Sequence, residues 1–150
     1  MIRVAAVSLA LLAMTISASE AVADPQFFAR PGSAAPFSPA VRAGDYIFAS
    51  GQIGATPDGK VPATMEEQAR LAMENVKAAL AFADADLDDV VKCTVMIDDI
   101  KLWSEFNKVY VTYFKPGRLP ARSAFGSNGL ALGAGVEVEC LAYKPLAATK

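Results

Sequence analysis

The sequence predicts an α+β domain in which a single β-sheet carries two helices on one face. Short apolar segments bounded by turn residues alternate with two longer segments of helical periodicity, in the order β-β-α-β-α-β-β. A chain of 150 residues suffices for one such domain and is too short for two domains with separate cores. The strands are apolar on both of their alternating faces. The sheet face opposite the helices therefore also needs a cover, and a partner subunit is the simplest one.

The N-terminal segment has the pattern of a secretory signal peptide. Arg3 gives a short positive start, the stretch 4–16 is almost wholly apolar, and Ala21-Val22-Ala23 supplies the small-x-small pattern of a cleavage site. An uncleaved anchor is disfavoured because the apolar stretch is shorter than the roughly 20 residues of a membrane-spanning helix. We expect cleavage between Ala23 and Asp24, which removes residues 1–23. The protein would then be exported, periplasmic or secreted, with a domain at residues 24–150.

The first part of the domain contains an irregular arm and two strands. Residues 24–35 include two prolines and Gly32, which favours irregular structure. Ala40–Arg42 and Tyr46–Ser50 are strand candidates on either side of a Gly-Asp turn pair. Pro57–Lys60 predicts a turn, because proline presets φ and glycine accepts the left-handed position.

A long helix is predicted from Thr64 to about Ala83. Thr64 is a favourable N-cap, and Glu67 three residues later completes a capping-box pattern. The apolar face comprises Ala69, Leu71, Ala72, Val76, Ala79, Leu80 and Ala83.

The second part of the chain supplies three strands and one further helix. Apolar residues at three- and four-residue spacing predict the helix, which the pair Pro116-Gly117 ends. The expected elements are an acidic turn at Asp84–Asp89, a strand at Val90–Ile97, a helix at Leu102–Phe114, strands at Ala121–Phe125 and Val136–Tyr143, and a glycine-rich loop at Gly126–Gly135 between the last two strands.

The composition excludes several classes of chemistry. The chain has 14 Lys and Arg against 16 Asp and Glu, a net charge of −2, and no histidine. A mildly acidic chain has no electrostatic footprint for nucleic acid or an anionic membrane. The absence of histidine removes Ser-His and Cys-His nucleophiles and the common zinc sites. We expect no metal and no organic cofactor.

The two cysteines, Cys93 and Cys140, both lie in apolar strand-like segments. They form a disulfide in an oxidising compartment only if their strands bring the Cα atoms within roughly 7 Å. Two separate buried thiols, packed as small hydrophobic groups, are the interpretation that the sequence favours.

Arg122 and Glu137 are the most informative charged residues, because each lies on an otherwise apolar strand. A buried charge needs a partner or a ligand, since leaving it unpaired costs several kcal/mol. The guanidinium fork suits a carboxylate, either from a protein side chain or from a small acid. Taken alone, these residues favour a cross-strand ion pair between Arg122 and either Glu137 or Glu139, which share one face of their strand.

Several dispersed motifs resemble those of the YjgF/RidA family, the reactive intermediate deaminases. The resemblance covers residues 36–143 in the correct order. It rests on Pro36–Val41, Ser50–Ile53, Asp88–Lys92, Phe106–Tyr110, Pro120–Ser123 and Val136–Glu139.

The resemblance implies a chorismate-mutase-like fold and a homotrimer whose three sheets line a central barrel, with ligand sites at the subunit interfaces. It also implies hydrolysis of small 2-imino or enamine acids to 2-keto acids and ammonia. By position, Arg122 would bind the substrate carboxylate and Glu137 would position the water. Asn107 and the Ser50-Gly51 backbone would form the neighbouring pocket wall.

Two positions depart from the family pattern. Ala124 stands where the family usually has a cysteine, and Phe37 stands where it usually has a tyrosine. Both departures leave the carboxylate-binding arginine in place. By position, the resemblance still implies that Phe37 and the backbone N–H of Ala124 belong to the substrate-binding pocket. A trimer that binds keto acids without catalysis is the alternative function, and an endoribonuclease is a further one that the acidic composition disfavours.

Overall fold

The computed structural model describes residues 24–146. The expected signal peptide, residues 1–23, lies outside the described residues, as do residues 147–150. Within the described range, no helix is both long enough and apolar enough to cross a membrane.

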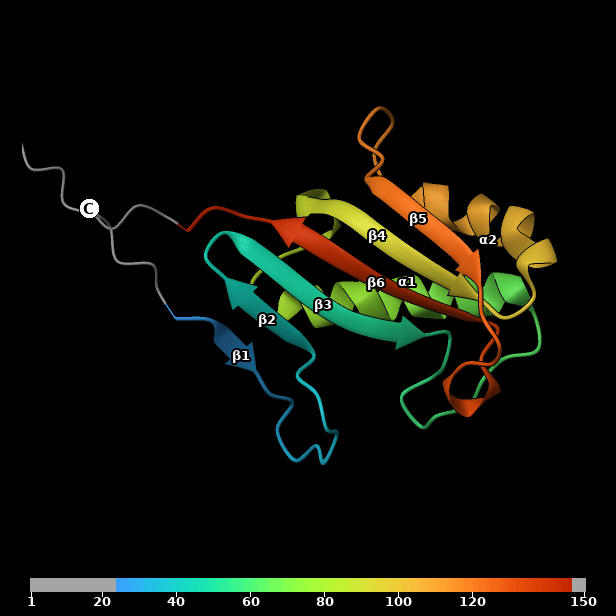
Figure 1. The fold of residues 1–150 in the computed structure, drawn as a ribbon, viewed down its shortest axis with the longest axis horizontal. Coiled ribbons are helices and arrows are strands. Elements are labelled where there is room, and N and C mark those ends of the chain that lie inside the picture. Colours follow the sequence, from blue (N-terminus) through green and yellow to red (C-terminus); the bar gives the residue numbers. More distant parts are fainter. Residues whose placement is uncertain (1–23, 147–150) are drawn as a thin grey trace, which may run out of the picture.

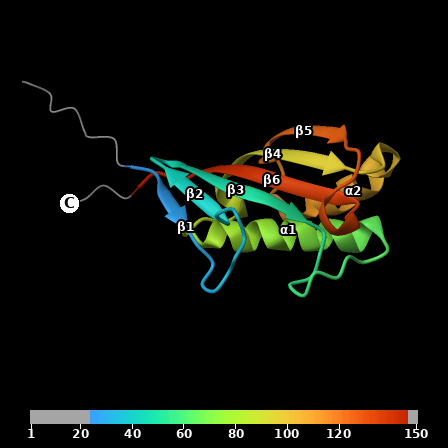
Figure 2. The same ribbon diagram turned by 60° about the horizontal axis from the view of Figure 1, so that its bottom comes forward.

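One six-stranded sheet forms the body of the domain, in the order β1-β2-β3-β6-β4-β5. Neighbouring strands are antiparallel except β4 and β5, which are parallel. Both α-helices lie on the same side of the sheet, as expected from the sequence (Figures 1 and 2). The strands are β1 Gln26–Phe28, β2 Ala40–Ala43, β3 Tyr46–Ile53, β4 Val90–Ile97, β5 Ala121–Gly126 and β6 Val136–Tyr143, and the helices are α1 Met65–Ala81 and α2 Trp103–Tyr110.

Apart from shifts of one or two residues at element ends, the structure differs from the sequence expectations at three places. The arm that we expected to be irregular contains β1, which pairs with β2 at one edge of the sheet. The second helix is α-helical only over Trp103–Tyr110, with 3₁₀ turns at Ile100–Leu102 and Val111–Tyr113. Strand β3 continues to Ile53 through an irregularity between Ala49 and Gln52. The last two differences trim or extend an expected segment, whereas β1 is an additional strand, and the layer arrangement is the expected one.

Helix α1 begins as the sequence predicts and packs one face against the sheet. The Thr64 hydroxyl accepts a hydrogen bond from the Glu67 N–H and donates one to its carboxylate, at 2.8 Å. Leu71 is only half-buried at the margin of the buried face, and Met73 occupies its centre. The buried face consists of Met65, Gln68, Ala69, Ala72, Met73, Val76, Ala79 and Leu80.

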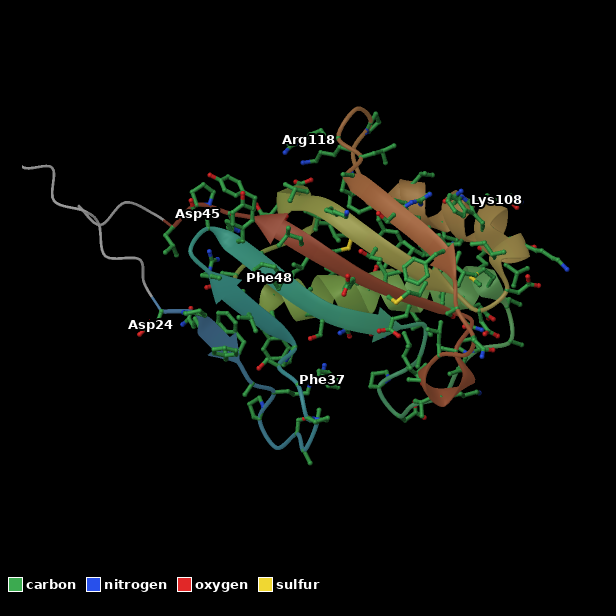
Figure 3. The ribbon with its side chains drawn as sticks, viewed as in Figure 1. Asp24, Phe37, Asp45, Phe48, Lys108 and Arg118 are labelled. Atoms are coloured by element: carbon green, nitrogen blue, oxygen red, sulfur yellow. A yellow bond between two sulfur atoms is a disulfide. The ribbon has the colours of Figure 1, made fainter. Side chains whose placement is uncertain are left out.

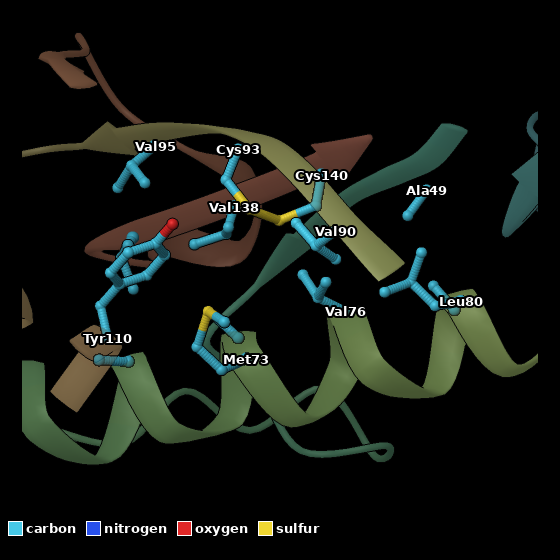
Figure 4. Close-up of a cluster of buried hydrophobic side chains, with 14 of the residues drawn as sticks. Ala49, Met73, Val76, Leu80, Val90, Cys93, Val95, Tyr110, Val138 and Cys140 are labelled. Carbon is cyan, nitrogen blue, oxygen red and sulfur yellow. A yellow bond between two sulfur atoms is a disulfide. The ribbon is translucent and has the colours of Figure 1, made fainter. Parts of the chain in front are cut away.

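A disulfide joins Cys93 of β4 to Cys140 of β6, so the expectation of two separate thiols is wrong (Figure 4). The two residues are direct cross-strand partners with their Cα atoms 4.1 Å apart. Both side chains face α1 and are buried. The bond closes a loop of 47 residues, and cross-links of this span typically stabilise a fold by about 2–4 kcal/mol.

The sheet face opposite the helices carries a group of exposed aromatic side chains. Tyr46 and Tyr143 stack edge to face across β3 and β6, with ring centroids 5.3 Å apart. Phe48 is 51% exposed, and Phe27 and Phe125 are also exposed. This is the uncovered apolar face that the strand pattern predicts.

Candidate functional site

Arg122 lies on the edge strand β5 and points to the helix side of the sheet. It is the register partner of Cys93 on β4. The side chains of register partners on neighbouring strands project to the same face of the sheet. Since Cys93 faces α1, the Arg122 side chain extends toward the helical layer, where α2 lies.

Three aromatic rings of α2 surround the Arg122 guanidinium. Its Cζ atom lies 4.7 Å from the ring centroid of Tyr110 and 5.3 Å from that of Trp103. The ring of Phe106 is 6.0 Å away. These are cation–π distances, at which the negative ring faces attract the cation. The four ion pairs within residues 24–146 involve other side chains, as do the hydrogen bonds found there, so the N–H groups of Arg122 remain unpaired in this part of the chain.

Asn107 and Ala124 lie on the same side as Arg122. Asn107 shares a helical stripe with Trp103 and Tyr110, four residues after one and three before the other. Its Oδ1 atom is buried and has no hydrogen-bond partner among the described residues. Ala124 follows Arg122 by two positions on β5 and packs against the core. We call Arg122, Asn107 and Ala124 the arginine group.

Tyr110 closes the inner side of this group. The residue is buried, and Figure 4 shows its hydroxyl pointing toward the sheet. Burial raises the pKa of Tyr110 to about 12, and the positive charge of Arg122 acts in the opposite direction. The phenol therefore remains neutral at physiological pH and contributes its ring face rather than a negative charge.

Glu137 lies on β6 and points to the opposite face of the sheet. The flanking residues Val136 and Val138 are fully buried beneath the sheet, so the alternation of side chains directs Glu137 to the open face. Desolvation raises the pKa of its carboxyl group, and the negative charge of Glu139 raises it further. A raised pKa makes Glu137 a better proton acceptor near neutral pH than an ordinary glutamate.

Gly51 and Ser50 lie beside Glu137. A Cβ atom on Gly51 would overlap with Glu137 Oε1, so only glycine leaves the carboxylate its present position. The Ser50 hydroxyl donates to the Ser38 carbonyl at 2.7 Å, which attaches the segment containing Phe37 to this strand. Phe37 is 60% exposed. We call Glu137, Ser50, Gly51 and Phe37 the glutamate group.

The structure thus divides the predicted site residues into two groups on different sides of the sheet. β4 separates the strands of Arg122 and Glu137, and the two side chains face in opposite directions. The expected ion pair between Arg122 and Glu137 or Glu139 is therefore wrong. Figure 3 shows Phe37 and Lys108 of α2 toward opposite edges of the sheet.

The glutamate group depends on a residue that sequence reasoning missed. Gln68 is the buried polar side chain of α1, and its Oε1 accepts a hydrogen bond from Gly135 N at 2.6 Å. Its amide nitrogen donates to the Pro62 carbonyl at 2.8 Å. These bonds fix the end of the glycine-rich loop two residues before Glu137. A polar glutamine in an amphipathic helix is normally assigned to the exposed face. The sequence therefore contains no indication that Gln68 is buried and binds the loop.

The glycine-rich loop is also anchored to Asp98, the residue that follows β4. Gly129 N donates to the Asp98 carboxylate at 2.8 Å, and Asp98 N donates to the Gly135 carbonyl at 3.0 Å. Leu132, at the loop tip, is 69% exposed. As for metals, residues 24–146 contain no group of three or more His, Cys, Asp or Glu side chains placed to hold an ion.

Comparison with known proteins gives consistent matches along the described chain. The family model described as Endoribonuclease L-PSP matches residues 27–144. The mouse protein named 2-iminobutanoate/2-iminopropanoate deaminase is 38% identical over 116 residues, which cover 76% of this chain and 85% of the mouse protein. The yeast mitochondrial protein MMF1 is 40% identical over 115 residues, covering 76% of this chain and 79% of that protein.

Solved structures show the same fold. The crystal structure of yeast Mmf1 superposes with a TM-score of 0.74 at 36% identity, covering 81% of this chain and 99% of that chain. Escherichia coli TdcF with bound serine superposes with a TM-score of 0.72 at 33% identity, covering 79% and 98%.

The raised pKa of Glu137 predicts a pH-dependent effect of Glu137→Gln on stability. Because the folded-state pKa lies above the unfolded one, ionisation of Glu137 costs folding free energy as the pH rises through the folded pKa. We expect the variant to gain stability relative to wild type at pH 7 and to lose most of that advantage near pH 4. Denaturant titrations at the two pH values measure this. The same substitution at exposed Glu105 is the control, and a Glu137→Gln effect that did not change between pH 4 and pH 7 would contradict the assignment.

Proposed function

Since this chain belongs to the YjgF/RidA family, whose model is described as Endoribonuclease L-PSP, we propose that it hydrolyses small 2-imino acids to 2-keto acids and ammonia. The observation that carries the proposal is that the guanidinium of Arg122 pairs with no carboxylate of the described residues. The guanidinium lies over aromatic rings, and its N–H groups have no protein partner within residues 24–146. Such a fork binds a carboxylate through two parallel hydrogen bonds.

The ligand class follows from the same chemistry. A small acid offers one carboxylate to Arg122 and places its reactive carbon a short distance away. The mouse relative is named for 2-imino acids, and TdcF was crystallised with serine, which has a carboxylate and a nitrogen on the adjacent carbon. Both relatives support a small carboxylate with nitrogen at the neighbouring position.

We propose that the complete site forms between two copies of this chain in a homotrimer. Arg122 and Glu137 face opposite sides of the sheet, so a single chain does not direct both at one small molecule. The open face carries exposed aromatic side chains that an adjacent subunit would cover. The arginine group of one subunit and the glutamate group of its neighbour would then enclose the ligand.

In the proposed reaction, Arg122 fixes the substrate carboxylate and Glu137 accepts a proton from water. The water oxygen adds to the carbon of the protonated imine, C=NH2⁺, and the π electrons of the C=N bond move to nitrogen. The product is a neutral carbinolamine, with hydroxyl and amino groups on one carbon. Glu137 returns the proton to the nitrogen, the C–N bond breaks and ammonia leaves. The hydroxyl oxygen forms the new carbonyl and gives its proton to Glu137, which passes it to solvent. The elevated pKa of Glu137 suits these proton transfers.

Arg122→Ala is expected to lower kcat/KM for imine hydrolysis by about thirtyfold or more, because truncating one member of a desolvated charged pair costs ~2–5 kcal/mol. The mature chain from Asp24 is assayed with an amino-acid oxidase that generates 2-imino acids, and semicarbazide traps the imine that remains. Arg118→Ala, at an exposed arginine outside both groups, is the control.

Unchanged imine loss with Arg122→Ala would refute the role of Arg122. Keto-acid binding that depends on Arg122, without any acceleration by wild type, would instead identify a non-catalytic binding protein of the same fold. A ribonuclease is not proposed, because a net charge of −2 provides no electrostatic attraction for RNA.

A site shared between subunits predicts complementation. Arg122→Ala and Glu137→Gln homotrimers are each expected to be inactive. Co-expression of the two variants should give mixed trimers with about a third of wild-type activity, because each mixed trimer has one interface of its three that pairs an intact Arg122 with an intact Glu137. Two affinity tags isolate the mixed trimers for assay. No recovery in mixed trimers would show that both residues act from one subunit.

We also propose that the protein is exported, on the basis of the signal-peptide pattern at residues 1–23. The Cys93–Cys140 disulfide supports this, because such bonds persist in oxidising compartments. The chain expressed from Met1 in a bacterial host should appear in the periplasmic fraction with Asp24 as its first residue. Its cysteines should not react with a thiol reagent in the denatured, unreduced protein. A full-length cytoplasmic product with two reactive thiols would refute the proposal, and a chain lacking residues 1–23 is the control.

A further inference from the structure

The environment of Arg122 contains one group that the proposed mechanism does not use. Trp103, Phe106 and Tyr110 recur at helical spacing on α2, so all three rings face the guanidinium from the same side of the helix. Phe106 and Tyr110 are 1% and 3% exposed and belong to the core. Trp103 is 37% exposed. It is therefore the ring that reaches solvent, the side from which a ligand approaches Arg122.

The contact with Trp103 restrains the cation without consuming its hydrogen-bonding capacity. A ring face attracts the guanidinium through the π system, whereas an acidic partner would bind the same N–H groups that a carboxylate ligand needs. Arginine otherwise has many rotamers, and fixing it before the ligand arrives reduces the entropy lost on binding. Indole is the strongest of the natural cation–π partners, and Trp103 is the sole tryptophan of the chain.

We propose that Trp103 is a positioning residue that holds the Arg122 guanidinium in its carboxylate-binding orientation. The inference rests on the proposed role of Arg122. Trp103 acts through the arginine, so its loss should weaken binding of every small 2-keto or 2-imino acid by a similar factor. The chemical step should change little, because Trp103 contacts Arg122 and takes no part in the proton transfers assigned to Glu137.

The first experiment measures binding of 2-oxobutanoate, a product analogue, to the mature protein by calorimetry. Trp103→Leu is expected to raise Kd by between about twofold and thirtyfold, the range of a cation–π contact, and Trp103→Phe by less. In imine hydrolysis, Trp103→Leu should raise KM by a similar factor with kcat within about twofold of wild type. In the Arg122→Met background, Trp103→Leu should cause no further loss of affinity.

A second measurement needs no ligand. Since Trp103 is the sole tryptophan, its fluorescence reports the contact directly. Arg122→Met should change the emission maximum or intensity, whereas the control Arg118→Met should leave both unchanged. Size-exclusion chromatography and circular dichroism confirm that each variant is folded and assembled.

The outcomes separate the two proposals. Arg122-dependent binding that Trp103→Leu leaves intact would overturn the role of Trp103 and leave the proposed function standing. An equal loss on Trp103→Leu with and without Arg122 would also overturn it, since the residue would then act independently of the arginine. If wild type shows no Arg122-dependent binding or hydrolysis, the proposed function fails and the inference fails with it.

Discussion

Backbone pairing of β6 with β3 on one side and β4 on the other determines where the chemistry of this domain lies. Along β6, alternate side chains enter the core and the remaining ones reach the open face, with a period of two residues. Val136 and Val138 pack beneath the sheet, which leaves Glu137 no direction except outward. A register shift of one residue would exchange these positions and bury the carboxylate. The disulfide to β4 and the Gln68 bond to Gly135 both hold this register.

The same constraint explains why Arg122 and Glu137 have no protein partner among the residues that the structure describes. A domain optimised only for stability would pair Arg122 with a carboxylate. Here the cation is stabilised by aromatic faces, and Glu137 is partly desolvated beside another negative charge. Each arrangement costs folding free energy relative to a paired charge. Unfavourable local arrangements of this kind are typical of ligand-binding sites, where function and not stability determines the residue. The rest of the fold, with its capped helix and closely packed core, follows the ordinary rules.

Sequence patterns predicted the layers and identified the charged residues, because both depend on local periodicity. Arg122 and Glu137 were recognisable as charges on apolar strands. Their relative placement was not, because it depends on β4 lying between β5 and β6, which is a long-range pairing. The prediction of two separate thiols was wrong for the same reason, because spacing in the sequence does not reveal that Cys93 and Cys140 are register partners. Strand β1 was missed because three residues among prolines carry little periodic signal.

The burial of the disulfide constrains when it can form and break. Cys93 and Cys140 are 1% and 4% exposed, and α1 covers them. Neither an oxidant nor a reducing thiol reaches the sulfur atoms once the helix has docked. The bond must therefore form while the sheet is still open, in the compartment where the chain folds. Afterwards the native protein keeps the disulfide in a reducing environment for as long as it remains folded. The oxidation state of the two cysteines therefore depends on the compartment in which the chain folded and not on the one in which it resides.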